Sequence, residues 1–166
     1  MSGIYTEENG KYQIDLTNAL YSIGDLGIKY AKTIGGMQSD VDWIAETEDA
    51  MILIEFKSYE KEGTFPKYEQ EKGEQLYQKI LKKYYGTVFF LMACGKKKPI
   101  YFIWILESPH MDSFVRKKYF QSIKKRLPFE LQKLPEIKVK LIENFKIMSV
   151  KEWNEEYSQF PLTKIT

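Results

Sequence analysis

The sequence predicts an α/β protein with a central mixed β-sheet flanked by helices. Apolar residues recur three and four positions apart in some segments, which is typical of one helix face. In others they alternate or form short runs, which is typical of strands. The resulting order, α, β, β, α, β, β, α, β, α, favours a sheet covered by helices. An apolar share of 43% with 15% aromatic residues indicates a folded chain, and 166 residues suit one domain spanning 1–166.

The first half of the chain is predicted to form a helix and two strands. Apolar spacings of three and four predict a helix over residues 14–34, ended by a glycine pair. Strands are predicted over 41–45 and 51–57, joined by the polar turn 46–49. Residues 60–73 are polar and contain glycine and proline, so they predict a surface loop.

The second half of the chain is also predicted to contain both helices and strands. A helix over 74–85 is expected to stop at Gly86. The remaining predicted elements are strands 87–94 and 99–106 joined by a basic hairpin tip at 95–98, a helix from Ser108-Pro109 to Leu127, a strand over 137–142 and a helix capped by Ser149.

Neither a membrane span nor a secretion signal is predicted. The longest apolar runs are far shorter than a bilayer requires, and the first residues lack a basic start followed by an apolar stretch. The single cysteine, Cys94, lies in an apolar run and is expected to be a small core residue. These features favour a cytoplasmic protein without a membrane partner.

Positive charge is concentrated in the middle of the chain. Between Lys79 and Arg126 there are 12 Lys or Arg against two acids, a balance of +10, which leaves −8 for the rest of a chain of net charge +2. Such a segment favours binding to a polyanion, although lysines also solvate ordinary helix faces. The candidate nucleic-acid-binding residues are Lys79, Lys82, Lys83, Lys96, Lys97, Lys98, Arg116, Lys117, Lys124 and Lys125.

The two predicted strands at 41–45 and 51–57 bring acidic residues and a lysine together. Alternation places Glu55 and Lys57 on one side of the second strand, and the turn can return Asp42 to that side. Hard divalent ions such as Mg²⁺ prefer carboxylate and carbonyl oxygens, so Asp42, Glu55 and the Phe56 carbonyl form a candidate metal site. Lys57 can orient an attacking water or neutralise charge in the transition state.

The run Asp42-x12-Glu55-Phe56-Lys57 resembles the PD-(D/E)XK nuclease superfamily, especially its resolvase-like and small restriction-endonuclease-like members. The resemblance covers roughly residues 16–94 and implies an αβββαβ core, here about 14–106, with a C-terminal extension over about 107–166. It implies that Asp42 and Glu55 bind Mg²⁺ or Mn²⁺ and that Lys57 assists catalysis. Some members carry a glutamine early in the next helix, for which Gln75 is the match and Gln78 the alternative.

The sequence departs from this pattern because the first predicted helix carries no glutamate as an additional metal ligand. Asp25, the only acid in the interior of that helix, is a possible substitute, and Asp40 is an alternative to Asp42 as the first acid. We therefore expect a metal-dependent nuclease that hydrolyses DNA. RNA is an alternative substrate, and the sequence leaves open whether the protein forms a homodimer. Two other hypotheses are a catalytically inactive nuclease-fold module that binds nucleic acid or protein, and an unrelated α/β interaction protein.

Overall fold

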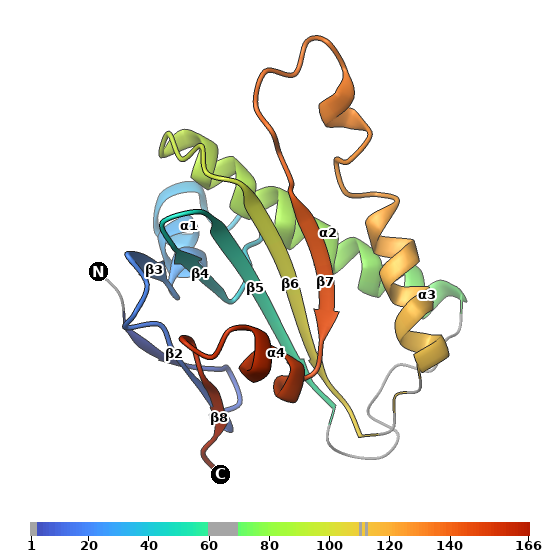
Figure 1. The fold of residues 1–166 in the computed structure, drawn as a ribbon. Coiled ribbons are helices and arrows are strands. Elements are labelled where there is room, and N and C mark those ends of the chain that lie inside the picture. The colour runs from blue at the N-terminus through green and yellow to red at the C-terminus, as the bar shows by residue number, and fades with distance from the viewer. Residues whose placement is uncertain (1–2, 60–69, 110, 112) are drawn as a thin grey trace.

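The computed structural model describes residues 3–59, 70–109, 111 and 113–166, and these contain four α-helices and two β-sheets (Figure 1). The larger sheet has the strand order β3-β4-β5-β6-β7. Its strands are β3 (Tyr21–Ile23), β4 (Trp43–Glu46), β5 (Met51–Ser58), β6 (Ile100–Glu107) and β7 (Asn144–Met148). Neighbours are antiparallel from β3 to β5 and parallel from β5 to β7. The prediction of a mixed sheet flanked by helices is confirmed.

The smaller sheet joins both ends of the described chain. It consists of β1 (Ile4–Thr6), β2 (Tyr12–Asp15) and β8 (Leu162–Lys164), with β2 in the centre and both pairings antiparallel. The segment after residue 107 therefore supplies β7 to the larger sheet and β8 to the smaller one, and is an integral part of the fold.

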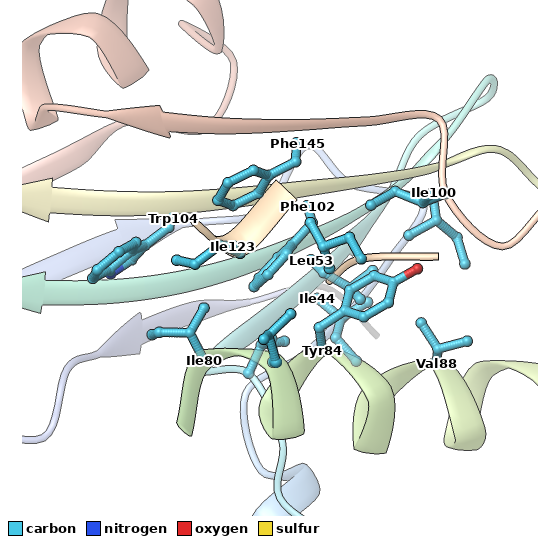
Figure 2. Close-up of a cluster of buried hydrophobic side chains, with 14 of the residues drawn as sticks. Ile44, Leu53, Ile80, Tyr84, Val88, Ile100, Phe102, Trp104, Ile123 and Phe145 are labelled. Atoms are coloured by element: carbon cyan, nitrogen blue, oxygen red, sulfur yellow. The ribbon is translucent and has the colours of Figure 1, made fainter. Parts of the chain in front are cut away.

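Helices cover both faces of the larger sheet. They are α1 (Leu26–Ile34), α2 (Gln70–Ala93), α3 (Ser113–Lys124) and α4 (Val150–Glu156). Of these, α1, α2 and α3 lie on one face, and α4 lies on the other together with the smaller sheet. Because side chains alternate along a strand, neighbouring residues enter two different cores. Leu53 packs with residues of α1, α2 and α3, whereas Ile54 packs with α4, β2 and β8. Figure 2 shows the first core, with Tyr84 of α2 against Phe102 of β6 and Val88 further along the same helix. No helix in the described residues is long and apolar enough to cross a bilayer.

The prediction of one helix over 14–34 is wrong, because β2, β3 and α1 divide this segment. Leu16 and Ala19 are buried in the core beside β2, whereas Leu26 and Tyr30 of α1 are buried in the core beneath α2. The apolar spacing therefore joined two segments that pack on different sides of the sheet.

The prediction that α2 ends at Gly86 and that a strand follows is also wrong. The helix continues to Ala93, with Val88 and Leu91 buried on the same face as Tyr84. Gly86 allows a close approach instead, since a Cβ there would lie 1.9 Å from the Ser39 carbonyl oxygen. Residues 95–98 consequently link α2 to β6, and they are not the tip of a hairpin.

Predictions for the other segments had mixed outcomes. Residues 137–142 form no strand, and β7 begins instead at Asn144. Cys94 is exposed rather than a core residue, because it follows the end of α2.

Ser149 caps α4 as expected. Its hydroxyl accepts a hydrogen bond from Glu152 N at 3.2 Å, and the Glu152 carboxylate accepts one from Ser149 N at 2.7 Å. Most of the loop predicted over 60–73 lies outside the described residues, and 70–73 belong to α2.

Candidate functional site

The β4–β5 hairpin brings Asp42 beside Glu55. Trp43 pairs with Ile54 across the antiparallel strands, so one step further along the register Asp42 lies opposite Glu55. The Asp42 carboxylate accepts a hydrogen bond from Phe56 N through Oδ2 at 2.8 Å. This bond fixes Asp42 at the point where β4 begins. The structure thus places the two acids as the alternation of the sequence predicts.

Glu55 is a fully buried carboxylate with one oxygen engaged and one open. Its side chain is 0% exposed, and Oε1 accepts a hydrogen bond from Lys83 Nζ at 2.6 Å. Its second oxygen, Oε2, has no hydrogen-bond partner among the described residues. Burial and then the nearby Asp42 charge raise the pKa of Glu55 to about 8, against the opposing attraction of Lys83.

Lys57 lies at the same site in a more open position. Its Nζ is 3.9 Å from Glu55 Oε1, and its side chain is 37% exposed. A small cavity of about 50 Å³ is lined by this lysine, Asp42, Phe56 and Ser58. The turn between β1 and β2, residues 7–9, also lines this cavity. Sequence reasoning missed this turn, because its approach depends on how the smaller sheet packs.

Lys83 belongs to the site, although the sequence placed it on an outer, nucleic-acid-binding face of its helix. The ammonium group contacts Glu55, and the attraction of Glu55, Asp42 and Asp40 raises the pKa of Lys83 despite its burial. Lys83 directly precedes the buried Tyr84 and therefore lies at the edge of the apolar stripe. The position of Lys83 beside this apolar stripe is the sequence signal that its side chain points toward the sheet.

The glutamines predicted from the resemblance do not occupy this position. Gln75 and Gln78 are both exposed on α2. Among the described residues of this helix, Lys83 is the one with a hydrogen bond to Glu55.

The two alternative acids are engaged at the start of α1. Asp40 is half-buried, and its carboxylate lies against Gly27, whose N–H lowers the pKa of Asp40 while the larger effect of burial raises it. Asp25 pairs with Lys29 at 3.3 Å, and both side chains are about half exposed. Of the candidate first acids, Asp42 is the one that lies opposite Glu55.

The other predicted basic residues divide into paired and exposed groups. Lys96 and Lys98 both pair with Glu46, at 2.8 and 3.0 Å, and Arg116 pairs with Glu152. These three are therefore held within the fold. The remaining candidates are exposed and form no ion pair with another described residue: Lys79, Lys82, Lys97, Lys117, Lys124 and Lys125.

The oxygens at the site fit a hard divalent cation that retains several water ligands. In a strand, the N–H and C=O of one residue point to the same side, so the Phe56 carbonyl faces the side of Asp42, to which Phe56 N donates. With Glu55 Oε2 this gives two carboxylates and one carbonyl, which suits Mg²⁺ or Mn²⁺. No group of three or more His, Cys, Asp or Glu side chains able to hold a metal is found in the part of the chain that the structure describes.

Comparisons with protein-family models, with curated proteins and with solved structures each find no match for this chain.

Proposed function

We propose that the protein is a metal-dependent nuclease that hydrolyses phosphodiester bonds in DNA. The observation that carries this proposal is the fully buried Glu55 carboxylate, which lies opposite Asp42, has one oxygen without a partner and has two lysines beside it. A buried carboxylate is costly unless it is compensated, so such arrangements concentrate at functional sites. A hard cation is the natural ligand for this set of oxygens.

The order of elements supports a restriction-endonuclease-like core with a rearranged start. Strands β3, β4 and β5 form an antiparallel unit, and α2 then leads to β6, which pairs parallel to β5. In the αβββαβ order all three strands follow the first helix, whereas here β3 precedes α1. The spatial arrangement around Glu55 remains that of a helix-covered mixed sheet.

Each side chain of the site has a distinct role in the proposed hydrolysis. Asp42, Glu55 and the Phe56 carbonyl bind the metal, which when bound polarises the phosphate and lowers the pKa of an attacking water. Lys57 is partly exposed beside Glu55, so it can reach the phosphate, orient water and neutralise developing charge. The exposed lysines, including Lys82 of α2, Lys124 at the end of α3 and Lys125 directly after it, contact the DNA backbone.

Cleavage of plasmid and linear DNA with Mg²⁺ or Mn²⁺ tests this function. Asp42→Asn, Glu55→Gln and Lys57→Met should each lower the cleavage rate at least about 100-fold, a typical effect of losing a group that stabilises the transition state. Asp49→Asn, an exposed acid in the β4–β5 turn, is the matched control and should cleave like the wild type. Wild-type rates in the Glu55 and Lys57 variants, or cleavage that persists in EDTA, would refute the proposal.

A second candidate function is a nuclease-fold module that binds nucleic acid without cleaving it. It is favoured by the direct contact of Lys83 with Glu55, and by the finding that no three acidic, His or Cys side chains of the described residues form a metal-holding group. In that case DNA or RNA affinity should fall steeply with salt and remain unchanged in Glu55→Gln, with no turnover in any divalent metal.

The surface that binds nucleic acid can be tested in either case. Lys124→Ala/Lys125→Ala should weaken binding and reduce its salt dependence, because both side chains are exposed. Lys96→Ala/Lys98→Ala should have a smaller effect, because these lysines are paired with Glu46. Equal losses of affinity in the two double variants would contradict the distinction between exposed and paired lysines. Parallel affinity measurements on DNA and RNA of one sequence show which nucleic acid the protein prefers.

A further inference from the structure

Among the residues that the structure describes, Lys83 is the cation closest to Glu55. Its Nζ lies 2.6 Å from Glu55 Oε1, whereas Lys57 Nζ lies 3.9 Å from the same atom. Burial strengthens this contact, because Glu55 is fully buried and Lys83 is 24% exposed. The dominant charge contact of Glu55 is therefore with α2 rather than with its own strand.

The backbone of α2 is held firmly at this point. The Thr87 hydroxyl donates to the Lys83 carbonyl at 2.8 Å and accepts from Val41 N at 3.0 Å. One residue earlier, the Gly86 carbonyl accepts a hydrogen bond from the Tyr30 hydroxyl. The bond from Val41 joins α2 to the segment directly before Asp42, and the bond from Tyr30 joins α2 to α1. The base of the Lys83 side chain therefore has a fixed place relative to both acids.

The charges around the site are nearly balanced without a metal. Lys83 is attracted by Asp40, Asp42 and Glu55, and Lys57 adds a second positive charge close to Glu55. With all five groups ionised the sum is −1, and a divalent cation would change it to +1. The ammonium of Lys83 and the metal therefore oppose each other at the same carboxylates.

We propose that Lys83 is a built-in competitor for the metal: it binds Glu55 while no metal is present, and a divalent cation must displace or overcome it. This inference rests on the proposed metal-binding function and concerns its regulation. The long side chain suits such an exchange, because its partial exposure lets the ammonium reach water when it leaves Glu55. Lys83 is thus a positioning residue that sets metal affinity, distinct from the lysines that contact nucleic acid.

Direct Mn²⁺ binding, measured by electron paramagnetic resonance of free Mn²⁺, tests the competition without relying on activity. Titrations are made without oxygen at about pH 8, so that Mn²⁺ stays reduced and fewer protons compete for the carboxylates. Lys83→Met should lower the Kd for Mn²⁺ on the order of tenfold, because a positive charge close to the ligands is removed. Lys83→Gln should act in the same direction, and Lys83→Arg should stay near the wild type.

Two control variants show that the effect belongs to this site. Lys82→Met removes the neighbouring exposed charge from the same helix and should leave the Kd unchanged. Glu55→Gln should abolish Mn²⁺ binding both in the wild type and together with Lys83→Met. Circular dichroism of every variant confirms that it is folded.

The competition is refuted if folded Lys83→Met and Lys83→Gln bind Mn²⁺ no more tightly than the wild type, or if neither the wild type nor these variants bind it. DNA cleavage is assayed separately. Tighter Mn²⁺ binding by the variants without cleavage by any of them would refute the nuclease function and keep the competition. Cleavage by the wild type, together with an unchanged Kd for Mn²⁺ in the Lys83 variants, would refute the competition and keep the nuclease function.

Discussion

Gly86→Ala is expected to destabilise the protein, although alanine is normally the better helix residue. In an exposed helix interior this change stabilises by about 0.5–1 kcal/mol. At this position, however, the new Cβ would lie 1.9 Å from the Ser39 carbonyl oxygen and 3.0 Å from the Ser39 carbonyl carbon. The clash is with backbone, so no side-chain rotation relieves it.

The cost follows from how far the segment before Asp42 must move. Real Cβ contacts essentially never fall below 3.0 Å, so α2 and this segment must separate by about 1 Å. That movement weakens two buried hydrogen bonds, from the Tyr30 hydroxyl to the Gly86 carbonyl and from Val41 N to the Thr87 hydroxyl. At about 1–3 kcal/mol for each buried group left unpaired, and after subtracting the gain in helix propensity, we expect a net loss of about 2–4 kcal/mol.

Urea unfolding, followed by tryptophan fluorescence, measures this loss as a lower midpoint at an unchanged slope. Gly73→Ala is the matched control in the same helix, because its Cβ would lie at an ordinary 3.5–3.6 Å from the Tyr77 ring. It should be neutral or stabilise by up to about 1 kcal/mol. A Gly86→Ala protein as stable as the wild type would refute the reasoning from the close approach.

Three further predictions concern other parts of the structure. Because burial raises the pKa of Glu55 from 4.5 to about 8, protonation favours the folded state, so wild-type stability should fall by roughly 2–4 kcal/mol as the pH rises from about 5 to about 8. The urea midpoint of Glu55→Gln should not fall over this pH range, and a fall of the same size in the wild type and the variant would contradict the prediction. Ser149→Ala removes the side-chain half of the α4 capping box and should cost about 1 kcal/mol by the same assay, whereas an unchanged midpoint would show that the cap is dispensable. Phe102→Ala leaves a cavity in the core shown in Figure 2 and should cost about 3–5 kcal/mol in thermal or urea unfolding, so a loss below 1 kcal/mol would indicate that the core collapses around it.

Local patterns predicted the parts of the fold that local physics determines. The alternation from Met51 onward gave β5 and its two faces, because a strand buried on both sides must still divide its side chains between two cores. Ser149 gave the start of α4, because a capping box involves only residues three apart. The placement of Asp42 opposite Glu55 followed from the same alternation and a short turn.

Long-range packing decided the parts that local patterns could not. Leu16 and Leu26 fit one helical stripe by spacing, yet they are buried on opposite sides of the larger sheet. Strand-forming residues at 87–91 are helical because Val88 and Leu91 continue the buried face of α2. No window of sequence contains the Ser39 backbone that makes Gly86 a contact point rather than a helix end.

These failures coincide with the most informative feature of the site. Dividing α2 at Gly86 left Lys83 near a supposed helix end, where an outward lysine among other lysines was the natural interpretation. In the continuous helix, Gly86 and Thr87 fix α2 against the segment that carries Asp42, and the preceding turn then directs Lys83 onto Glu55. The same close approach therefore links the position of the first acid to that of the cation beside the second. A variant that loosens this contact, such as Gly86→Ala, should consequently alter Mn²⁺ affinity as well as stability.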